Sequence, residues 1–219
     1  MHLIMFDIDG TLVDSAGFDG ELFAQAVEAE LGIEVDRSWH SYRHVTDSGI
    51  LGELLATCTA AAERQAIYDR VKRRFVALVE TYVAGQPAGL VPIPGAPTFV
   101  AMLRATPGVI VALATGGWRE TAELKLAAAG IDFAGLPFAS ATDAPARADI
   151  MRVAEQRATP FGPFRRRSYF GDGPWDAAAS AELGYDFVGV GNRTEHPVRI
   201  ADYAEPGAVM ALLAIQRVT

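Results

Sequence analysis

Short unbroken apolar runs alternate with longer segments of helical spacing through the first few residues and the second half of the chain. Such runs are typical of strands that are covered on both faces of a sheet. The runs that predict strands are Leu3–Phe6, Val109–Ala114, Leu136–Ala139, Ser168–Phe170 and Phe187–Val190. The segments that predict helices are Ala96–Ala105, Arg119–Ala129, Arg147–Arg157, Trp175–Leu183 and Pro206–Gln216. Alternating strands and helices predict an α/β fold with a doubly wound, Rossmann-like parallel sheet.

The segment between the first two predicted strands differs, because helical spacing continues through it and no strand pattern interrupts it. The expected features are a helix over Phe18–Leu31 capped by Asp14 or Ser15 and stopped at Gly32, a second helix capped at Asp47–Ser48, and a third around Ile67–Val79. A stretch rich in Pro and Gly, residues 85–95, is typical of a linker. We therefore expect a core of residues 1–14 and 88–219, interrupted by an all-helical cap of residues 15–87.

Composition narrows the possible functions. The chain has 219 residues, half of them hydrophobic, which is enough for a substantial core. A formal net charge of -8 argues against general affinity for nucleic acid. No apolar stretch is long enough to span a membrane, and too few apolar residues precede Asp7 for a signal peptide. Cys58 is the single cysteine, and we expect its side chain to be buried and chemically inert. So few cysteines suit a reducing compartment, so we expect a cytoplasmic protein. We also expect a monomer.

The first predicted strand ends in two acids, Asp7 and Asp9, which are followed by Gly10 and Thr11. Ligands of parallel sheets collect beyond the carboxyl ends of the strands, so both acids are expected at a binding edge. Two carboxylates held together repel each other unless a cation or a proton relieves the repulsion. This arrangement favours chemistry with one carboxylate as nucleophile, the other as proton donor, and a divalent metal nearby.

Two other predicted strands end in residues of the same kind. Thr115 and Gly116 follow Val109–Ala114 and precede a helix, where a hydroxyl and free backbone N–H groups can hold phosphate; a simple helix cap at Thr115 is the alternative. Asp172 follows Ser168–Phe170 between two glycines, and no structural role explains it. Together with Asp7 and Asp9 it would complete an oxygen site suited to Mg²⁺.

The third motif also contains Pro174 and Asp176, which have ordinary explanations. Proline suits the first position of a helix, and an acid in the first turn complements the positive end of the helix dipole. The basic run Arg165–Arg167 is interpreted as a solvated loop before a strand, with phosphate binding as the alternative.

These three motifs, in this order and with a helical insertion after the first, resemble the haloacid dehalogenase superfamily, most closely its phosphoglycolate-phosphatase-like members. The motif residues are Asp7-Ile8-Asp9-Gly10-Thr11-Leu12-Val13-Asp14-Ser15, Thr115-Gly116 and Gly171-Asp172-Gly173-Pro174-Trp175-Asp176. The resemblance covers essentially the whole chain, although the insertion matches only in type.

The resemblance implies a Mg²⁺-dependent phosphatase acting on a small phosphorylated metabolite. Asp7 would be the nucleophile that forms an aspartyl phosphate, and Asp9 would serve as acid and then as base. Asp172 would bind Mg²⁺ with the Asp7 side chain and the Asp9 backbone carbonyl. Thr115 and the Gly116 N–H would hold the oxygens of the phosphoryl group.

One element departs from the family pattern, which places a lysine before the helix that follows the fourth-strand region. The segment aligns best with Arg147 there, and an arginine can supply the same charge with a bidentate grip. Arg152, one helical turn further on, is the second candidate for this role. Lys125, within a core helix, is the third.

The cap offers a dense polar group, made up of Arg43, His44, Thr46 and Asp47. These residues either select the substrate or simply connect two helices, with Asp47 as a cap. The core motifs suit a phosphatase and a phosphosugar mutase equally. A dehalogenase needs neither a leaving-group acid nor a metal, and a non-catalytic binding protein would have lost one of the acids, so Asp9 and Asp172 argue against both.

Overall fold

A parallel sheet lies at the centre of the computed structural model, which describes residues 1–86 and 88–213. Its six strands in the described residues are β1 (His2–Phe6), β2 (Val109–Ala114), β3 (Phe138–Ala139), β4 (Arg166–Gly171), β5 (Asp186–Val190) and β6 (Arg199–Ile200). They lie in the order β3-β2-β1-β4-β5-β6, and every paired strand is parallel to its neighbour. The chain builds outward from β1 on one side and then on the other, which confirms the doubly wound α/β fold.

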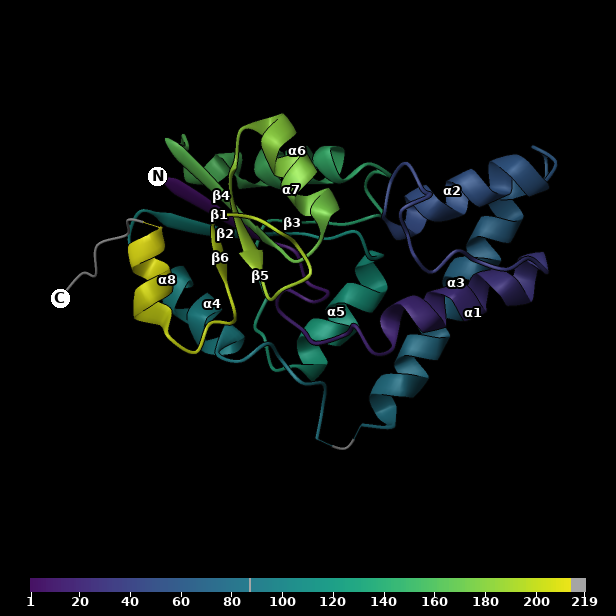
Figure 1. Cartoon of the computed structure of the whole chain (residues 1–219), viewed down its shortest axis with the longest axis horizontal. Helices are drawn as coiled ribbons and strands as arrows, with labels where there is room; N and C mark the ends of the chain where they lie inside the picture. The colour runs from purple at the N-terminus through teal and green to yellow at the C-terminus, as the bar shows by residue number, and fades with distance from the viewer. Residues whose placement is uncertain (87, 214–219) are drawn as a thin grey trace.

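Helices cover both faces of this sheet (Figure 1). Alternate residues of β1 point to opposite faces, so Ile4 and Phe6 join one buried cluster while Leu3 and Met5 join another. The helices on the first face are α4 (Ala96–Arg104), α5 (Arg119–Ala128) and α8 (Pro206–Leu212); those on the second are α6 (Arg147–Ala158) and α7 (Pro174–Leu183). Burial on both faces explains why the strands show unbroken apolar runs rather than alternation.

Three helices pack against one another beside the sheet (Figure 1): α1 (Asp19–Leu31), α2 (Asp47–Cys58) and α3 (Arg64–Ala84). Trp118, which precedes α5, is fully buried in their shared apolar cluster. Its indole Nε1 donates to the hydroxyl of Tyr68 on α3, at 2.9 Å. A side chain from the sheet side thus anchors the three helices, and the division into a core and a cap at residues 15–87 stays a prediction.

Several local expectations were wrong. The side chains of Asp14 and Ser15 do not cap α1, whose N-cap is Phe18, and α2 is capped by Thr46, whose hydroxyl accepts from Gly49 N. Capping depends on the turn in which the chain enters a helix, and several polar residues preceded each helix. Gly32 adopts the left-handed conformation at the end of α1, as expected.

The basic run and the cysteine also differ from expectation. Arg166 and Arg167 belong to β4 and pair with Asp186 and Glu155, so the predicted loop was wrong for both. Cys58 is exposed at the end of α2, where the helix terminates in solvent. The sequence pattern did not predict the two-residue strand β6 or a 3-10 turn at Thr159–Phe161. The end of the expected last helix, residues 214–216, lies outside the described residues.

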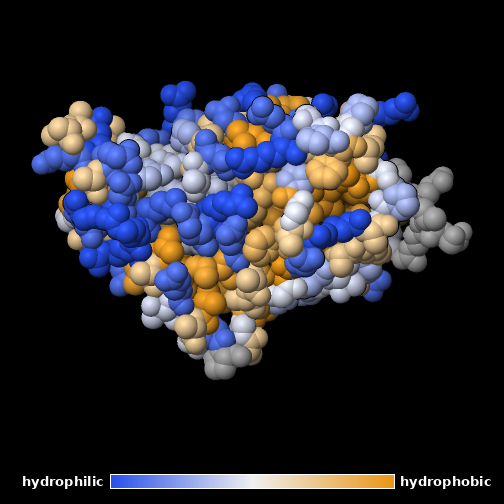
Figure 2. Space-filling model, turned by 180° about the vertical axis from the view of Figure 1, so that it is seen from behind, coloured by the Kyte–Doolittle hydropathy of each residue, from blue (hydrophilic) through white to orange (hydrophobic). Residues whose placement is uncertain are grey.

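Polar and apolar side chains are unevenly distributed over the surface. Seen from behind, the end of the molecule formed by α1–α3 is largely hydrophilic, and apolar side chains gather nearer the centre (Figure 2). Among the residues that the structure describes, no helix has the length and apolar character needed to cross a bilayer.

Candidate active site

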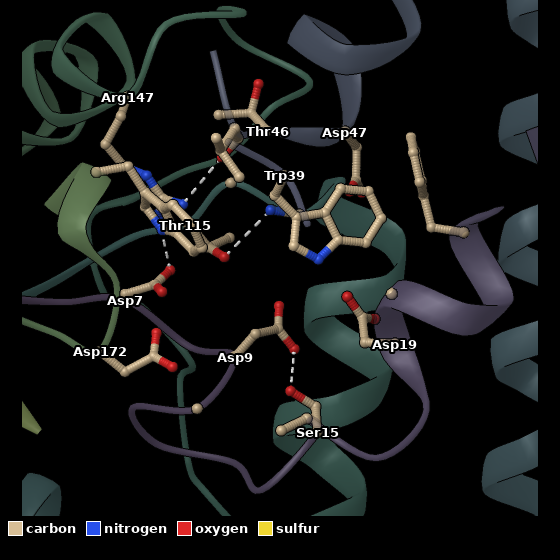
Figure 3. A pocket seen from close by; sticks show the side chains of 18 of the residues that line it. Asp7, Asp9, Ser15, Asp19, Trp39, Thr46, Asp47, Thr115, Arg147 and Asp172 are labelled. Carbon is tan, nitrogen blue, oxygen red and sulfur yellow. Dashed lines mark hydrogen bonds and ion pairs between the residues drawn. The ribbon is translucent and has the colours of Figure 1, made fainter. Parts of the chain in front are cut away.

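The strand register brings the three predicted motifs to one edge of the sheet. Phe6 of β1 lies beside Leu113 of β2 and Phe170 of β4, so the chain leaves all three strands at the same level. Asp7, Thr115 and Asp172 therefore converge on one cavity of about 160 Å³ (Figure 3). The parallel register of the strands is by itself enough to bring these residues to a common edge, as predicted.

Arg147 holds the predicted nucleophile from the first turn of α6. Its Nη1 lies 3.0 Å from Asp7 Oδ1 and 3.2 Å from Asp176 Oδ1, and all three side chains are buried. Asp176 also accepts from Gly173 N at 3.0 Å, as an acid in the first turn of α7 should. Asp176 thus completes a helix terminus and at the same time orients Arg147 toward Asp7.

The two alternative cations lie elsewhere. Arg152 is exposed on α6 and pairs with Asp149 and Glu182, away from the cavity. Lys125 is fully buried and pairs with Asp9 rather than with Asp7. Of the three candidates, Arg147 is the one whose charge contacts Asp7.

A group of carboxylates fits a metal ion at this edge. Single oxygens from Asp7, Asp172 and Asp176 all lie within 4.8 Å of one another. Asp172 is also paired with Arg193, whose Nη1 lies 2.7 Å from Oδ2. A Cβ at Gly10 would lie 2.1 Å from the same Asp172 oxygen, so only glycine leaves room for this carboxylate. Oxygen donors of this kind suit a hard divalent cation.

The protonation of these acids reflects their crowding. Burial raises the pKa of Asp7 to about 7, with Arg147 opposing the shift and Asp176 and Asp9 adding to it. Burial and the charge of Asp7 likewise raise the pKa of Asp172 to about 7, although Arg193 opposes this. Negative charge here exceeds what the two arginines offset, so the group favours a proton or a bound cation.

Asp9 lies between this group and the helical side of the cavity (Figure 3). Its Oδ1 accepts from Ser15 Oγ at 2.7 Å and contacts Lys125 Nζ at 2.5 Å. The ammonium of Lys125 also lies 2.8 Å from Asp19 Oδ1 at the start of α1. Burial alone would lower the pKa of Lys125, but Asp19 and Asp9 raise it above its usual value.

Thr115 and Gly116 occupy the position expected of a phosphate-binding loop. Helix α5 has Trp118 as its N-cap, so the alternative role of Thr115 as a helix cap was wrong. The buried Thr115 hydroxyl accepts from Gly117 N at 3.3 Å. A Cβ at Gly116 would lie 2.5 Å from Arg147 Nη2, so a side chain there would displace the guanidinium.

The start of α2 closes the cavity from the opposite side. Thr46 Oγ1 donates to Pro145 O at 2.6 Å, and Asp47 N donates to Gly116 O at 2.8 Å. The Asp47 carboxylate accepts from Trp118 N at 2.7 Å. Burial and the neighbouring charge of Asp19 raise the pKa of Asp47 well above its usual value.

The polar group predicted in the cap divides into two pairs. Thr46 and Asp47 line the cavity, whereas Arg43 and His44 do not. The backbone N–H groups of Arg43 and His44 donate to the Glu53 carboxylate. Sequence reasoning missed Asp19, Trp39 and Arg193, which also line the cavity. Asp19 could have been found from its position in the first turn of α1, the helix that follows the Asp7 and Asp9 motif.

Comparison with known proteins agrees with this geometry. A family model described as haloacid dehalogenase-like hydrolase matches residues 1–184, a span that includes every cavity residue named above except Arg193. The chain belongs to this family. A search of curated proteins returned no match.

Solved structures share the fold of this haloacid dehalogenase-like hydrolase at low sequence identity. A hydrolase from Pseudomonas syringae is 18% identical with a TM-score of 0.72, over 99% of this chain and 100% of that one. CbbY from Rhodobacter sphaeroides, in complex with phosphate, is 21% identical with a TM-score of 0.68, over 94% and 96%. A β-phosphoglucomutase from Clostridium difficile is 16% identical with a TM-score of 0.68, over 93% and 92%. These likenesses show the fold alone.

The raised carboxylate pKa values predict how metal-free stability depends on pH. The pKa of Asp172 is about 7 in the folded protein, whereas in the unfolded chain it returns to its ordinary value of 3.8. The unfolded state then binds fewer protons between these values, so stability falls as pH rises through this window. We expect the free energy of unfolding of Asp172→Asn to rise relative to that of the wild-type protein between pH 4 and pH 8. The difference at pH 8 should be on the order of 1–2 kcal/mol.

The measurement is urea unfolding of both proteins across this pH range, with and without Mg²⁺. A cation that binds only the folded state should raise wild-type stability at pH 8 more than that of the variant. A difference between the two proteins that stays constant with pH, or that shrinks, would contradict the assignment of Asp172 to this charge cluster.

Proposed function

We propose that the protein is a Mg²⁺-dependent phosphatase that hydrolyses a small phosphomonoester through an aspartyl-phosphate intermediate. The observation that carries this proposal is the buried pair of Asp7 and Arg147 beside Asp172. A carboxylate that must approach an anionic phosphate needs neighbouring positive charge, and this cavity supplies it at the nucleophile itself.

In the first step, a carboxylate oxygen of Asp7 attacks phosphorus while the ester P–O bond breaks. Asp9 donates its proton to the departing alkoxide, which leaves as a neutral alcohol. The products are an acyl phosphate on Asp7 and the Asp9 carboxylate. Attack requires ionised Asp7, and the contact with Arg147 at 3.0 Å favours that form.

In the second step, the Asp9 carboxylate takes a proton from water as the water oxygen attacks phosphorus. The bond between Asp7 and phosphorus breaks, which releases inorganic phosphate and regenerates both acids. Arg147, Thr115 and the Gly116 N–H would hold the phosphoryl oxygens through both steps. The Asp7 and Asp172 side chains, with the Asp9 backbone carbonyl, would hold Mg²⁺, which when bound stabilises negative charge on the phosphoryl group.

The helical side of the cavity indicates which leaving groups fit. Within the described part of the chain, the lining contributed by residues 15–50 includes Asp19 and Asp47 but no lysine or arginine. The nearby Lys125 is already paired with Asp9 and Asp19. A second phosphate or a carboxylate on the leaving group would meet these acids without a free cation, so we propose a substrate with an uncharged alcohol.

The same lining argues against a phosphosugar mutase. A mutase returns the phosphoryl group to its substrate, so its intermediate carries two phosphates, one of them on the leaving-group side. That side of the cavity holds Asp19 and Asp47, which would repel the second phosphate. Continuous release of inorganic phosphate from a monoester separates the two activities.

Replacement of Asp7 tests the proposed reaction. We expect wild-type protein to release phosphate from para-nitrophenyl phosphate only with Mg²⁺, and Asp7→Asn to lower turnover by about 10³-fold or more, because an amide cannot form the acyl phosphate. Phosphate release and p-nitrophenol are measured together, with circular dichroism to confirm folding. Activity that persists in folded Asp7→Asn would end the proposal.

Arg147 and Arg152 form a matched pair on one helix. We expect Arg147→Ala to lower kcat by about 10²-fold or more, because the charge next to the transferring phosphoryl group is lost. Arg152→Ala removes an exposed arginine with two surface ion pairs and should leave kcat within about twofold of wild type. Steady-state kinetics on one aryl phosphate measures both, and the opposite ranking would contradict the role of Arg147.

Leaving-group charge is tested with a panel of alkyl phosphates of similar size. We expect kcat/KM to be higher for glycerol or propyl phosphate than for phosphoglycolate or a bisphosphate by about tenfold or more, the effect of one close like-charge contact. Asp47→Asn should narrow this gap, because it removes one of the two acids. A preference for the anionic leaving groups would contradict the proposed substrate class.

A further inference from the structure

The two carboxylate oxygens of Asp9 have different surroundings. Oδ1 contacts both Ser15 Oγ and Lys125 Nζ, at 2.7 and 2.5 Å. Oδ2 lies on the cavity side, where a Cβ at Gly117 would come within 3.4 Å of it. Figure 3 shows one oxygen turned toward Ser15 and the other toward the space beneath Thr115 and Trp39. Among the described residues, the side-chain hydrogen bonds and ion pairs of Asp9 are thus all made by Oδ1.

Lys125 is an unusual residue for its position on α5. It is fully buried, as are its neighbours Thr121, Ala122 and Leu126 on the same helix. Removing an ammonium from water costs several kcal/mol, and an apolar side chain of the same size would avoid that cost. Its ion pairs join Asp9 to Asp19, which are contributed by the acid motif and by the start of α1.

We propose that Lys125 is a positioning residue for Asp9, and this inference rests on the proposed phosphatase reaction. The Lys125 ammonium and the Ser15 hydroxyl both contact Oδ1, and Asp19 holds the ammonium through a second ion pair. Because Oδ1 already contacts the ammonium and the Ser15 hydroxyl, Oδ2 is the oxygen through which Asp9 would exchange a proton with the leaving group. Lys125 therefore directs proton transfer to the oxygen that faces the leaving group.

The leaving group provides the test, because the demand for a proton depends on it. Nitrophenolate leaves without protonation, whereas an alkoxide requires a proton from Asp9. We expect Lys125→Met to lower single-turnover phosphorylation of Asp7 by an alkyl phosphate about 10²-fold, and by para-nitrophenyl phosphate less than about threefold. The variant should then show a burst of one nitrophenol per enzyme before a slower steady state, since the second step needs Asp9 as base.

The chain supplies its own control, because Lys72 is its only other lysine. Lys72 on α3 is half-buried, pairs with Glu120 and lies outside the cavity lining. Lys72→Met should leave both rates and their ratio at wild-type values. Circular dichroism and thermal unfolding establish that each variant is folded.

Equal losses on the two substrates in folded Lys125→Met, or an unchanged ratio of the two rates, would overturn the proposal and leave Lys125 a structural residue. If Lys125→Met does not fold, Lys125→Gln keeps hydrogen-bond donors without the charge, and the same ratio is measured. Ser15→Ala removes the other contact to Oδ1 and should shift the ratio in the same direction by a smaller factor. Failure of the phosphatase proposal itself is seen separately, as activity that survives Asp7→Asn.

Discussion

Electrostatic repulsion between acids at one sheet edge is the constraint on which the rest of the site depends. Asp7, Asp172 and Asp176 present oxygens within 4.8 Å of one another in a buried setting, where an unpaired carboxylate is costly. Arg147 offsets part of this charge through Asp7 and Asp176, and Arg193 offsets part through Asp172. The remaining excess of negative charge suits a divalent cation, and that cation together with Arg147 would then attract a phosphate dianion.

Asp9 separates two acidic regions that would differ in electrostatic character once a cation is bound at the sheet edge. On one side, arginines and the proposed metal favour the phosphoryl group. On the other side, Asp19 pairs with the buried Lys125, and Asp47 also lines the cavity, an arrangement that we propose favours an uncharged alcohol. A proton donor located between the two regions can protonate an oxygen at the moment when the bond to phosphorus breaks. The position of Asp9 on the loop after β1 and its contact with Lys125 would therefore serve the same proposed chemistry.

The sequence was sufficient to predict the strand ends but not the contacts between helices. Asp7, Thr115 and Asp172 follow apolar runs, and parallel register alone then brings them to one edge. Arg147 was predicted from the family resemblance, which aligned it with a lysine at the start of the helix that the structure has as α6. The pair of Lys125 and Asp9 joins residues 116 positions apart and depends on how α5 is rotated, which no local pattern specifies. The choice of the residues that cap α1 and α2, and the exposure of Cys58, likewise depended on tertiary surroundings.

The contact between α2 and the loop at Gly116 would couple the proposed substrate selection to the fold. Asp47 N donates to Gly116 O and its carboxylate accepts from Trp118 N, while the Trp118 indole is buried among α1–α3. The residue proposed to repel anionic leaving groups is thus bonded to the loop proposed to hold the phosphoryl oxygens. Movement of the three helices away from the sheet would break these bonds and open the cavity to water, so a closed cavity requires the Trp118 anchor to remain in place.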